Sequence, residues 1–424
     1  MAKTACRFEP KKIENRRRII IKKPELLAPA GDLEKLKTAA HFGADAVYVG
    51  GLKFGLRARA KNFNPDELEE GVAYAKKRGV KVYVAANVFA RDDDFYDMTE
   101  YFKTLREIGV NAVIASDPAV ISLALEMGID VHVSVQANVT NWRSALFWRN
   151  IGAKRVVAAR ELSFADIRNM RVHLPPSLEI EAFAHGAMCV AYSGRCFLSS
   201  YMTGRDANAG NCSHACRWEY AVVEKSRPLE KMPIEEDERG AYVMSSKDLC
   251  LIRRVPELIR AGVSSLKIEG RVKSPHYVAT TVAAYRRAID DYFTDAAVYE
   301  RNKDIYMNEL MKIADRGFTD GFAVKTPSRQ DYAYEKRDRA YAFLGVVQSY
   351  DERAKTVVIE QRGKFCIGDK VEFLRANGSV VTHTLTEMSD DEGTPIESAP
   401  RAKQLARFKL DEKLSRYDIL RKRL

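Results

Sequence analysis

The chain has 424 residues, 46% of them hydrophobic, and its 69 Lys and Arg residues against 58 Asp and Glu give a net charge of +11 at pH 7. No window approaches the roughly 18 uninterrupted apolar residues that a membrane span requires, so we expect no membrane association. The N-terminus has charges but no apolar signal segment, and we therefore expect a cytoplasmic protein.

Positive charge is concentrated at the two ends of the chain. Residues 1–23 hold nine Lys or Arg against two Glu, and residues 401–424 hold nine against three acidic residues. Basic ends on a nearly neutral body fit arms that bind a phosphate backbone. Solvated charge that aids solubility explains either end equally well when it is taken alone. We define residues 1–23 as a basic N-terminal arm.

Short apolar runs alternate with helix-like segments along residues 24–294. The runs are continuous rather than alternating, which is typical of parallel strands covered on both faces. Asn64-Pro65 and Ser274-Pro275 are typical helix starts, and a helix is expected to resume at Ser245 after the seventh strand. Eight strand–helix units predict an α/β fold, a (β/α)8 TIM-like barrel. The expected strands are 25–28, 46–49, 80–86, 112–115, 131–135, 156–159, 178–183 and 265–268.

The pattern changes after the barrel. Residues 295–340 have mixed composition and are predicted to form a linker. Residues 341–412 show strand-like alternation with turn signals at Gly368-Asp369 and Asn377-Gly378, which predicts a small C-terminal all-β barrel domain. Residues 413–424 are then expected to form a basic tail.

Four of the seven cysteines lie in one glycine-rich loop, residues 187–218, after the seventh strand: Cys189, Cys196, Cys212 and Cys216. Grouped thiolates bind zinc or an iron–sulfur cluster. Wide spacing without a C-x2-C pair favours a [4Fe-4S] cluster, while zinc and cysteines without metal stay open as alternatives. Because barrel enzymes react at the loops that follow their strands, we expect this loop at the catalytic mouth.

Polar residues at the other strand ends are expected to face the same mouth. Arg57, Arg59 and Arg271 are the best candidates for binding substrate, because grouped guanidinium groups are costly without a shared anion. His185 and Glu161 are candidates for proton transfer, although packing of His185 or an Arg160–Glu161 ion pair explains them as well. Other strand-end candidates are Asn62, Asn87, Ser116, Asp117, Gln136, Asn138, Arg160, Lys267 and Glu269.

The run from Glu181 to Ser199 resembles the signature of the peptidase U32 family, E-x-F-x2-G-[SA]-[LIVM]-C-x4-G-x-C-x-[LIVM]-S, at every fixed position. Residues 24–51, PELLAPAGDLEKLKTAAHFGADAVYVGG, and the later SLKIEGRVKSPHYV extend the resemblance over nearly the whole chain. Residues 208–218 are similar to the branch that includes tRNA uridine hydroxylation proteins. Ser213-His214-Ala215 departs from that branch, since many relatives have Gln-Pro before the final cysteine.

The resemblance implies an RNA-modifying enzyme that hydroxylates the tRNA wobble uridine to 5-hydroxyuridine. It implies an iron–sulfur cluster on the four cysteines and prephenate as co-substrate, whose two carboxylates fit the arginine group. tRNA is the implied partner, and a homologous U32 subunit is a possible second one. A 23S rRNA hydroxylase and a quinone-pathway hydroxylase are alternatives within the family, and the basic ends favour RNA.

Two other functional classes remain open. The family's name implies a peptidase or collagenase, but the sequence has no HExxH zinc motif and no GxSxG elbow. Cys189 near His185 is the conceivable nucleophile–base pair. A zinc-stabilised RNA-binding module without catalysis is the third possibility.

Overall fold

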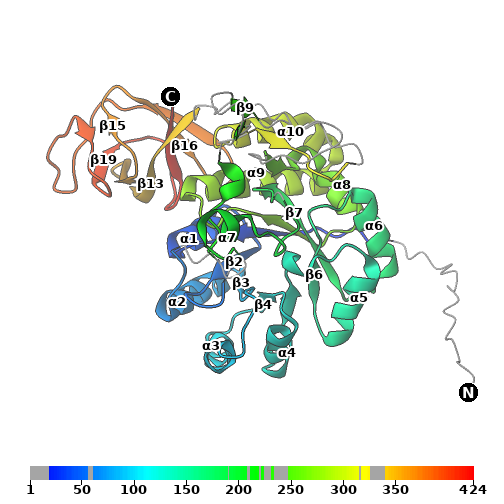
Figure 1. The fold of residues 1–424 in the computed structure, drawn as a ribbon. Coiled ribbons are helices and arrows are strands. Elements are labelled where there is room, and N and C mark those ends of the chain that lie inside the picture. Colours follow the sequence, from blue (N-terminus) through cyan, green and yellow to red (C-terminus); the bar gives the residue numbers. More distant parts are fainter. Residues whose placement is uncertain are drawn as a thin grey trace, which may run out of the picture.

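The computed structural model describes residues 19–55, 61–189, 191–207, 211–218, 221–223, 231–233, 247–314, 317–324 and 340–424. Eight parallel strands form a barrel, which closes because the last strand pairs with both the first and the seventh. The predicted (β/α)8 barrel is therefore confirmed (Figure 1). Its strands are β1 (Glu25–Pro29), β2 (Ala46–Gly50), β3 (Lys81–Ala85), β4 (Ala112–Ala115), β5 (Val131–Val133), β6 (Arg155–Val157), β7 (Glu179–Gly186) and β11 (Ser265–Ile268).

Helices surround the barrel and bury the outer faces of its strands. Asn64 caps one helix through a hydrogen bond from the Glu67 backbone, and Ser274 caps another through the Tyr277 backbone, so both predicted starts are confirmed. The helices are α1 (Leu33–His41), α2 (Pro65–Lys76), α3 (Asp94–Ile108), α4 (Pro118–Glu126), α5 (Trp142–Ile151), α6 (Phe164–His173), α8 (Val255–Arg260) and α9 (Pro275–Thr294).

A helix was expected to begin at Ser245, after the cysteine loop. Ser245 itself lies outside the described part of the chain, but the residues that follow it do not form the expected helix. From Asp248 the chain forms a strand, β10 (Asp248–Cys250), which pairs antiparallel with the end of β7 and parallel with β12 (Phe318–Thr319). Leu249 and Cys250 are buried there. The expected helix is therefore replaced by a short strand, because these apolar residues pair with the end of β7. Helix α8 begins only at Val255.

The predicted linker of residues 295–340 is largely structured. Helix α10 (Ala296–Met311) packs along α9 and buries Tyr299, Tyr306 and Leu310. The Tyr299 hydroxyl donates a hydrogen bond to the Ile252 carbonyl at 2.8 Å. The linker prediction is therefore wrong for this stretch, which extends the helical layer of the barrel; residues 325–339 lie outside the described residues.

The C-terminal domain is all-β, as predicted. Residues 340–424 form a six-stranded antiparallel sheet in the order β17-β16-β20-β13-β14-β19. Within this range no pairing joins β17 to β19, so the sheet is a half-barrel rather than a closed barrel. Its strands are β13 (Tyr341–Asp351), β14 (Thr356–Gln361), β16 (Lys370–Leu374), β17 (Val380–Thr384), β19 (Leu405–Lys409) and β20 (Ile419–Arg423), with β15 (Phe365–Cys366) and β18 (Ser398–Ala399) as a separate pair.

The predicted basic tail, residues 413–424, contains strand β20 and belongs to this sheet. Arg421 is fully buried and contacts Glu372 at 2.9 Å and Glu309 of α10 at 2.8 Å. Lys422 contacts Asp369 at 2.9 Å. Part of the C-terminal charge therefore joins the two domains through ion pairs, which is why it does not form a separate arm.

The half-barrel lies against the barrel beside α1, α9 and α10 (Figure 1). Val346, Leu374 and Ile419 join the core of the barrel, and the His41 ring contacts the Asp418 carboxylate at 2.8 Å. In the described part of the chain, no helix is both long and apolar enough to cross a membrane.

Candidate active site

A cavity of about 250 Å³ opens at the carboxyl ends of the barrel strands. Side chains at the ends of β2 to β7 and of β11 line it, together with most of the cysteine loop, as expected for a barrel mouth. The loop contains helix α7 (Leu198–Thr203) and the 3-10 turn η2 (Ala215–Arg217), and is followed by the hairpin strands β8 (Ala221–Val223) and β9 (Lys231–Pro233). The predicted position of the loop at the mouth agrees with this geometry.

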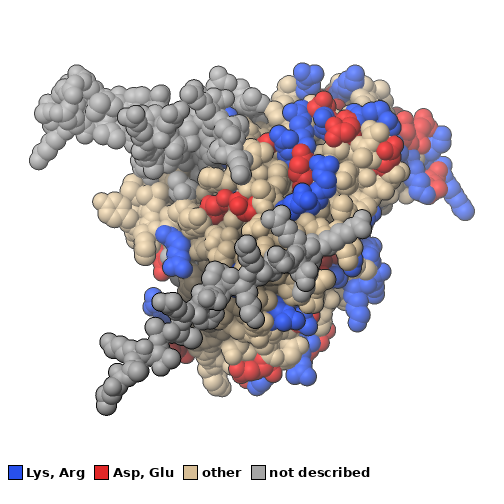
Figure 2. All heavy atoms as spheres, turned by 90° about the vertical axis from the view of Figure 1, so that its right-hand side faces the viewer, with Lys and Arg blue, Asp and Glu red and all other residues tan. Residues whose placement is uncertain are grey.

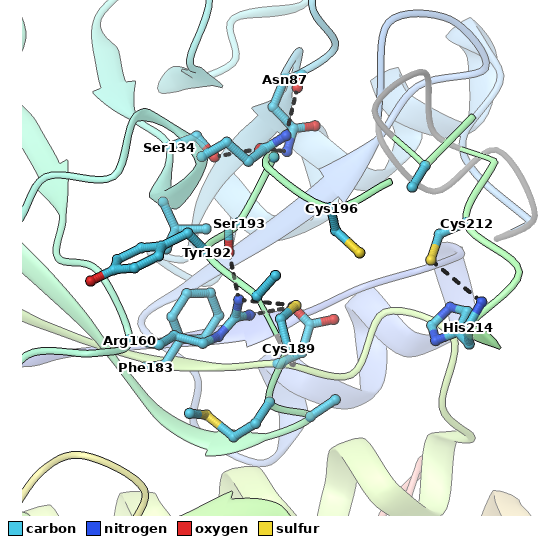
Figure 3. Close-up of a pocket in the computed structure, with 18 of the residues that line it drawn as sticks. Asn87, Ser134, Arg160, Phe183, Cys189, Tyr192, Ser193, Cys196, Cys212 and His214 are labelled. Atoms are coloured by element: carbon cyan, nitrogen blue, oxygen red, sulfur yellow. Dashed lines mark hydrogen bonds and ion pairs between the residues drawn. The ribbon is translucent and has the colours of Figure 1, made fainter. Parts of the chain in front are cut away.

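All four loop cysteines line the cavity as free thiols. The sulfurs of Cys189, Cys196 and Cys212 point toward one shared space (Figure 3). The backbone N–H of His214 donates to the Cys212 sulfur at 3.4 Å. Donors of this kind stabilise thiolates, which are the form of cysteine that binds metal.

The donor set can be tested against the two expected metal groups. Within the described residues, no group of three or more His, Cys, Asp or Glu side chains is arranged to hold a single metal ion. Four thiols around one cavity provide the kind of donor that a [4Fe-4S] cluster takes, and grouped thiolates also bind zinc. The donor set therefore fits either group.

Arg160, at the end of β6, is the cation that contacts a cysteine. Its Nη1 atom lies 3.6 Å from the Cys189 sulfur and donates to the Ser193 hydroxyl at 3.0 Å. Its guanidinium stacks on the Phe183 ring at 3.9 Å from the centroid, and Nη2 lies 4.0 Å from a Glu269 oxygen. The side chain is 8% exposed, so its charge acts inside the cavity with little screening by water.

A buried charge network supports the floor of the cavity. Lys267, which lines the floor, donates from Nζ to Glu181 at 2.6 Å. Glu181 is fully buried and also accepts from Arg155 Nη1 at 3.1 Å, and Arg155 continues to Glu25 at 2.6 Å. Burial raises the pKa of Glu181, but the charges and hydrogen bonds of Lys267 and Arg155 outweigh it and hold the pKa below 4.5.

An amide wall, formed by Asn87, Ser134 and Gln136, also lines the cavity. Figure 3 shows Asn87 and Ser134 on the side away from Cys189. Gln136 Oε1 accepts from Asn87 Nδ2 at 2.6 Å and from the Ser134 hydroxyl at 2.8 Å, and its Nε2 donates to the Asn87 carbonyl at 3.1 Å. These bonds fix the orientation of the Gln136 amide. Asn87 and Gln136 were expected at the mouth from their places after the strands.

The predicted substrate-binding arginines are only partly described. Arg271 is buried and lines the cavity. Its guanidinium lies so close to the Gly50 backbone that an added Cβ would meet Nη1 at 2.4 Å, so a larger residue at position 50 would displace the Arg271 side chain. Arg57 and Arg59 lie outside the described residues. Glu161 is partly exposed and is absent from the cavity lining, so its proposed role in proton transfer stays a prediction.

His185 faces away from the cavity. The register between β7 and β11 shifts by one residue after Phe183, so that Phe183 pairs with Lys267 but His185 pairs with Ile268. This bulge turns His185 toward α9, where it contacts the rings of Tyr277 and Tyr285. Burial lowers its pKa to about 3, so it is neutral at neutral pH. Its predicted catalytic role is untested.

Arg160 and Glu181 are the residues whose roles sequence reasoning missed. The sequence suggests Glu161 as the partner of Arg160, whereas Arg160 contacts Cys189 and Ser193. Glu181 was identified in the sequence only as a position of the family signature, and no charge partner was predicted for it. A carboxylate within an apolar strand is the signal that identifies it, since such a charge needs a buried partner.

Family models match both parts of the chain. Residues 31–332 match the model described as peptidase family U32, and residues 339–421 match the model of the peptidase family U32 C-terminal domain. The second match begins close to the first strand of the half-barrel, β13.

Relatives with established names are similar over most of the chain. A protein named tRNA hydroxylation protein P1, from Bacillus subtilis (strain 168), is 42% identical over 99% of this chain and 99% of its own length. tRNA hydroxylation protein P of Escherichia coli (strain K12) is 37% identical over 89% of this chain and 92% of its own. A 23S rRNA 5-hydroxycytidine C2501 synthase of Escherichia coli (strain K12) is 36% identical over 70% of this chain but 45% of its own.

The buried network predicts a large and pH-dependent effect of changing Glu181 to Gln. We expect the free energy of unfolding at pH 7 to fall by about 3–5 kcal/mol, because Lys267 and Arg155 lose a buried counter-charge. The pKa of Glu181 is lowered, so its contribution is complete above pH 4.5 and is lost as the pH falls further. The difference between the two proteins should therefore narrow on acidification, as measured by urea unfolding from pH 7 to pH 3.

Glu179→Gln is the matched control, because Glu179 also contacts Arg155 but its side chain is 44% exposed. This change should lower the free energy of unfolding by about 1 kcal/mol or less. Two results would contradict the role given to the buried network. One is an equal loss of unfolding free energy in the two variants, and the other is a difference between wild type and Glu181→Gln that does not change with pH.

Proposed function

Because the chain belongs to the peptidase U32 family, we propose that it is an RNA-modifying hydroxylase that acts on tRNA. One observation carries the proposal: four thiols and several cations line one cavity at the barrel mouth. Support also comes from the 42% identity, over 99% of the chain, to a protein named for tRNA hydroxylation. The reaction we propose is hydroxylation of the wobble uridine to 5-hydroxyuridine.

The charge of the cavity supports an anionic co-substrate. Among the described lining residues, Arg160, Lys267 and Arg271 are positive, and Glu269 is the carboxylate. Lys267 is paired with Glu181, so the guanidinium groups of Arg160 and Arg271 are the candidates for binding an anion, since guanidinium groups bind carboxylates through paired hydrogen bonds. We propose prephenate, a dicarboxylate, as the co-substrate, with Arg271 as one of its binding residues.

We propose that Cys189, Cys196, Cys212 and Cys216 hold a [4Fe-4S] cluster. When bound, such a cluster supplies electron transfer at the mouth. The residues around it have separate tasks. Arg160 places positive charge 3.6 Å from the Cys189 sulfur, while the amide wall offers hydrogen-bonding groups beside the space for a substrate.

Binding of the polynucleotide is proposed to involve the basic arm, residues 1–23, and the half-barrel. On the face shown in Figure 2, Lys and Arg of the described body are mixed with Asp and Glu rather than collected in one large patch. Since Arg421 and Lys422 are used in ion pairs, the C-terminal contribution rests on exposed cations such as Arg401, Lys403 and Arg416.

The second candidate is a 23S rRNA hydroxylase, which the named rRNA synthase relative supports. It is less well supported because this chain covers only 45% of that relative. A cysteine peptidase is disfavoured by the site itself. His185 is turned toward α9 and Cys189 contacts Arg160, so the Cys189–His185 pair is not formed.

Cys212→Ala tests the ligand set. Wild-type protein purified without oxygen should carry about four irons and four sulfides per chain with broad visible absorbance. The variant should lose most of the iron and the absorbance, and a strain that depends on it should lose 5-hydroxyuridine from its tRNA. Metal analysis and nucleoside mass spectrometry are the measurements.

Cys366→Ser is the control, because Cys366 lies in the half-barrel on β15 and is not among the residues that line the cavity. It should keep full iron and full modification. A Cys212→Ala protein with wild-type iron would show that the ligand assignment is wrong, and one zinc without iron in the wild type would move the cysteines to a structural role.

Removal of residues 1–18 tests the basic arm, because this segment holds seven Lys or Arg against two Glu. We expect weaker tRNA binding at low salt and a flatter plot of log K against log salt, by about 0.7–0.9 for each phosphate that the arm neutralises. Fluorescence anisotropy at several salt concentrations measures both. A variant with the same 18 residues in shuffled order should bind like the wild type, whereas an unchanged slope after deletion would assign these charges to solubility.

A further inference from the structure

Large aromatic side chains are exposed on the cysteine loop and on the segment after β3. Phe197 is 74% exposed and Tyr201 is 86% exposed, and Tyr192, Phe89 and Trp218 are each more than 40% exposed. Four of these five residues belong to the cysteine loop. Exposed apolar side chains that gather at one place indicate a binding surface, whereas scattered ones need no explanation.

The rings lie on or next to segments that line the cavity. Tyr192 lines it, with its ring directed away from the labelled cysteine sulfurs (Figure 3). Phe89, which follows β3, lies against Gly194, where an added Cβ would meet its ring at 3.3 Å. Leu198 and Ser199 of α7 also line the cavity, and Phe197 and Tyr201 lie beside them, one helical turn apart.

Helix α7 is held in place by hydrogen bonds. The Ser199 hydroxyl donates to the Arg205 carbonyl at 2.8 Å, and the Ser213 backbone N–H donates to the Ser199 oxygen at 2.9 Å. These bonds tie α7 to the segment that carries Cys212. The exposed rings are therefore displayed by an anchored element next to the cysteines, which reduces the entropy lost when something stacks on them.

Cations accompany the rings. Arg195 is exposed and lies in sequence between Tyr192 and Phe197, and Arg160 donates at 3.0 Å to the hydroxyl of Ser193, which follows Tyr192. Aromatic faces combined with arginine and lysine are the chemistry that binds unpaired nucleobases, since each base has a face that stacks and a phosphate that pairs with a cation.

We propose that Phe197 and Tyr201, supported by Tyr192 and Phe89, form a stacking surface for unpaired bases of an RNA loop at the entrance of the cavity. The inference rests on the proposed function in that it takes RNA as the substrate. It adds that the enzyme selects nucleotides free of base pairing. A base inside a duplex has no exposed face to stack and cannot reach the cavity.

The test compares two RNAs of equal charge, a stem–loop and a blunt duplex, against the full-length protein. In the double variant Phe197→Ala/Tyr201→Ala, the Kd for the stem–loop should rise by about 5-fold to 100-fold for each ring that stacks, while the Kd for the duplex stays the same. The salt dependence should not change, because no cation that binds phosphate is removed. A 2-aminopurine placed in the loop should be quenched by the wild type and not by the double variant.

Two further variants separate stacking from other effects. Tyr201→Trp should keep the affinity for the stem–loop, because it keeps an aromatic face. Phe147→Ala, which removes an exposed ring from the outer helix α5, should leave both Kd values unchanged. Iron content should equal that of the wild type in every variant, which shows that the fold and the cysteine loop are intact.

Three outcomes would overturn the stacking surface. The double variant could lose affinity equally for the stem–loop and the duplex, or it could bind both RNAs like the wild type. In the third outcome the wild type is a dimer, the double variant is a monomer, and the monomer still binds RNA. The last result, from sedimentation velocity, would assign the rings to a second copy of the chain. Failure of the proposed function looks different, since the wild type would then bind neither RNA and form no 5-hydroxyuridine.

Discussion

The buried carboxylate of Glu181 connects the stability of the barrel to the chemistry of its mouth. It stands on β7 and contacts cations on the two neighbouring strands, Arg155 on β6 and Lys267 on β11. Arg155 reaches across to Glu25 on β1, whose carboxylate also accepts from the Ser265 hydroxyl of β11. The region where β7, β11 and β1 close the barrel is thus fixed by charge as well as by backbone pairing. Because the network ends at Lys267, it also fixes the cation on the floor of the cavity.

The shift in strand pairing after Phe183 decides which residues belong to the site. Up to that point β7 alternates in register with β11, and Phe183 faces the cavity, where Arg160 stacks on it. The bulge then turns His185 to the helical layer. Gly186 follows with a φ of +102°, and an added Cβ there would meet the Glu269 carbonyl at 2.4 Å. The cysteine loop can begin at this point because only glycine allows the chain to pass so close to β11.

Most of the barrel could be predicted from the sequence because its strands are buried on both faces and read as continuous apolar runs. Helix α10 was missed because it buries only a narrow stripe, Tyr299, Tyr306 and Leu310, within a mostly polar segment. Strand β20 was mistaken for a tail because the cations at its end resemble a solvated charge run, and Arg421 is buried only through carboxylates distant in sequence.

The sequence predicts which residues meet at the candidate site, because the order of the parallel strands decides this. The cysteines, Gln136 and Arg271 lie at strand ends or in the loop after β7, and the strands' parallel order brings them to one edge. Side-chain direction was not predictable in the same way. His185 follows the alternation of β7 in sequence, yet a one-residue bulge reverses it, and periodicity alone cannot locate a bulge. Arg160 contacts Cys189 and Ser193 rather than its sequence neighbour, because those partners come from a loop whose path depends on glycine conformations.

Helix α7 divides the cysteine loop into two segments, each of which carries two cysteines. Cys189 and Cys196 precede it, and Cys212 and Cys216 follow it, so the helix separates the thiols into two pairs. The Ser199–Ser213 contact at 3.0 Å holds the second pair against the helix. All four thiols nevertheless line the same cavity, because the loop folds back after the helix. Since the same helix carries Tyr201 and adjoins Phe197, the two pairs of thiols and the exposed rings of the loop share one hydrogen-bonded support, helix α7.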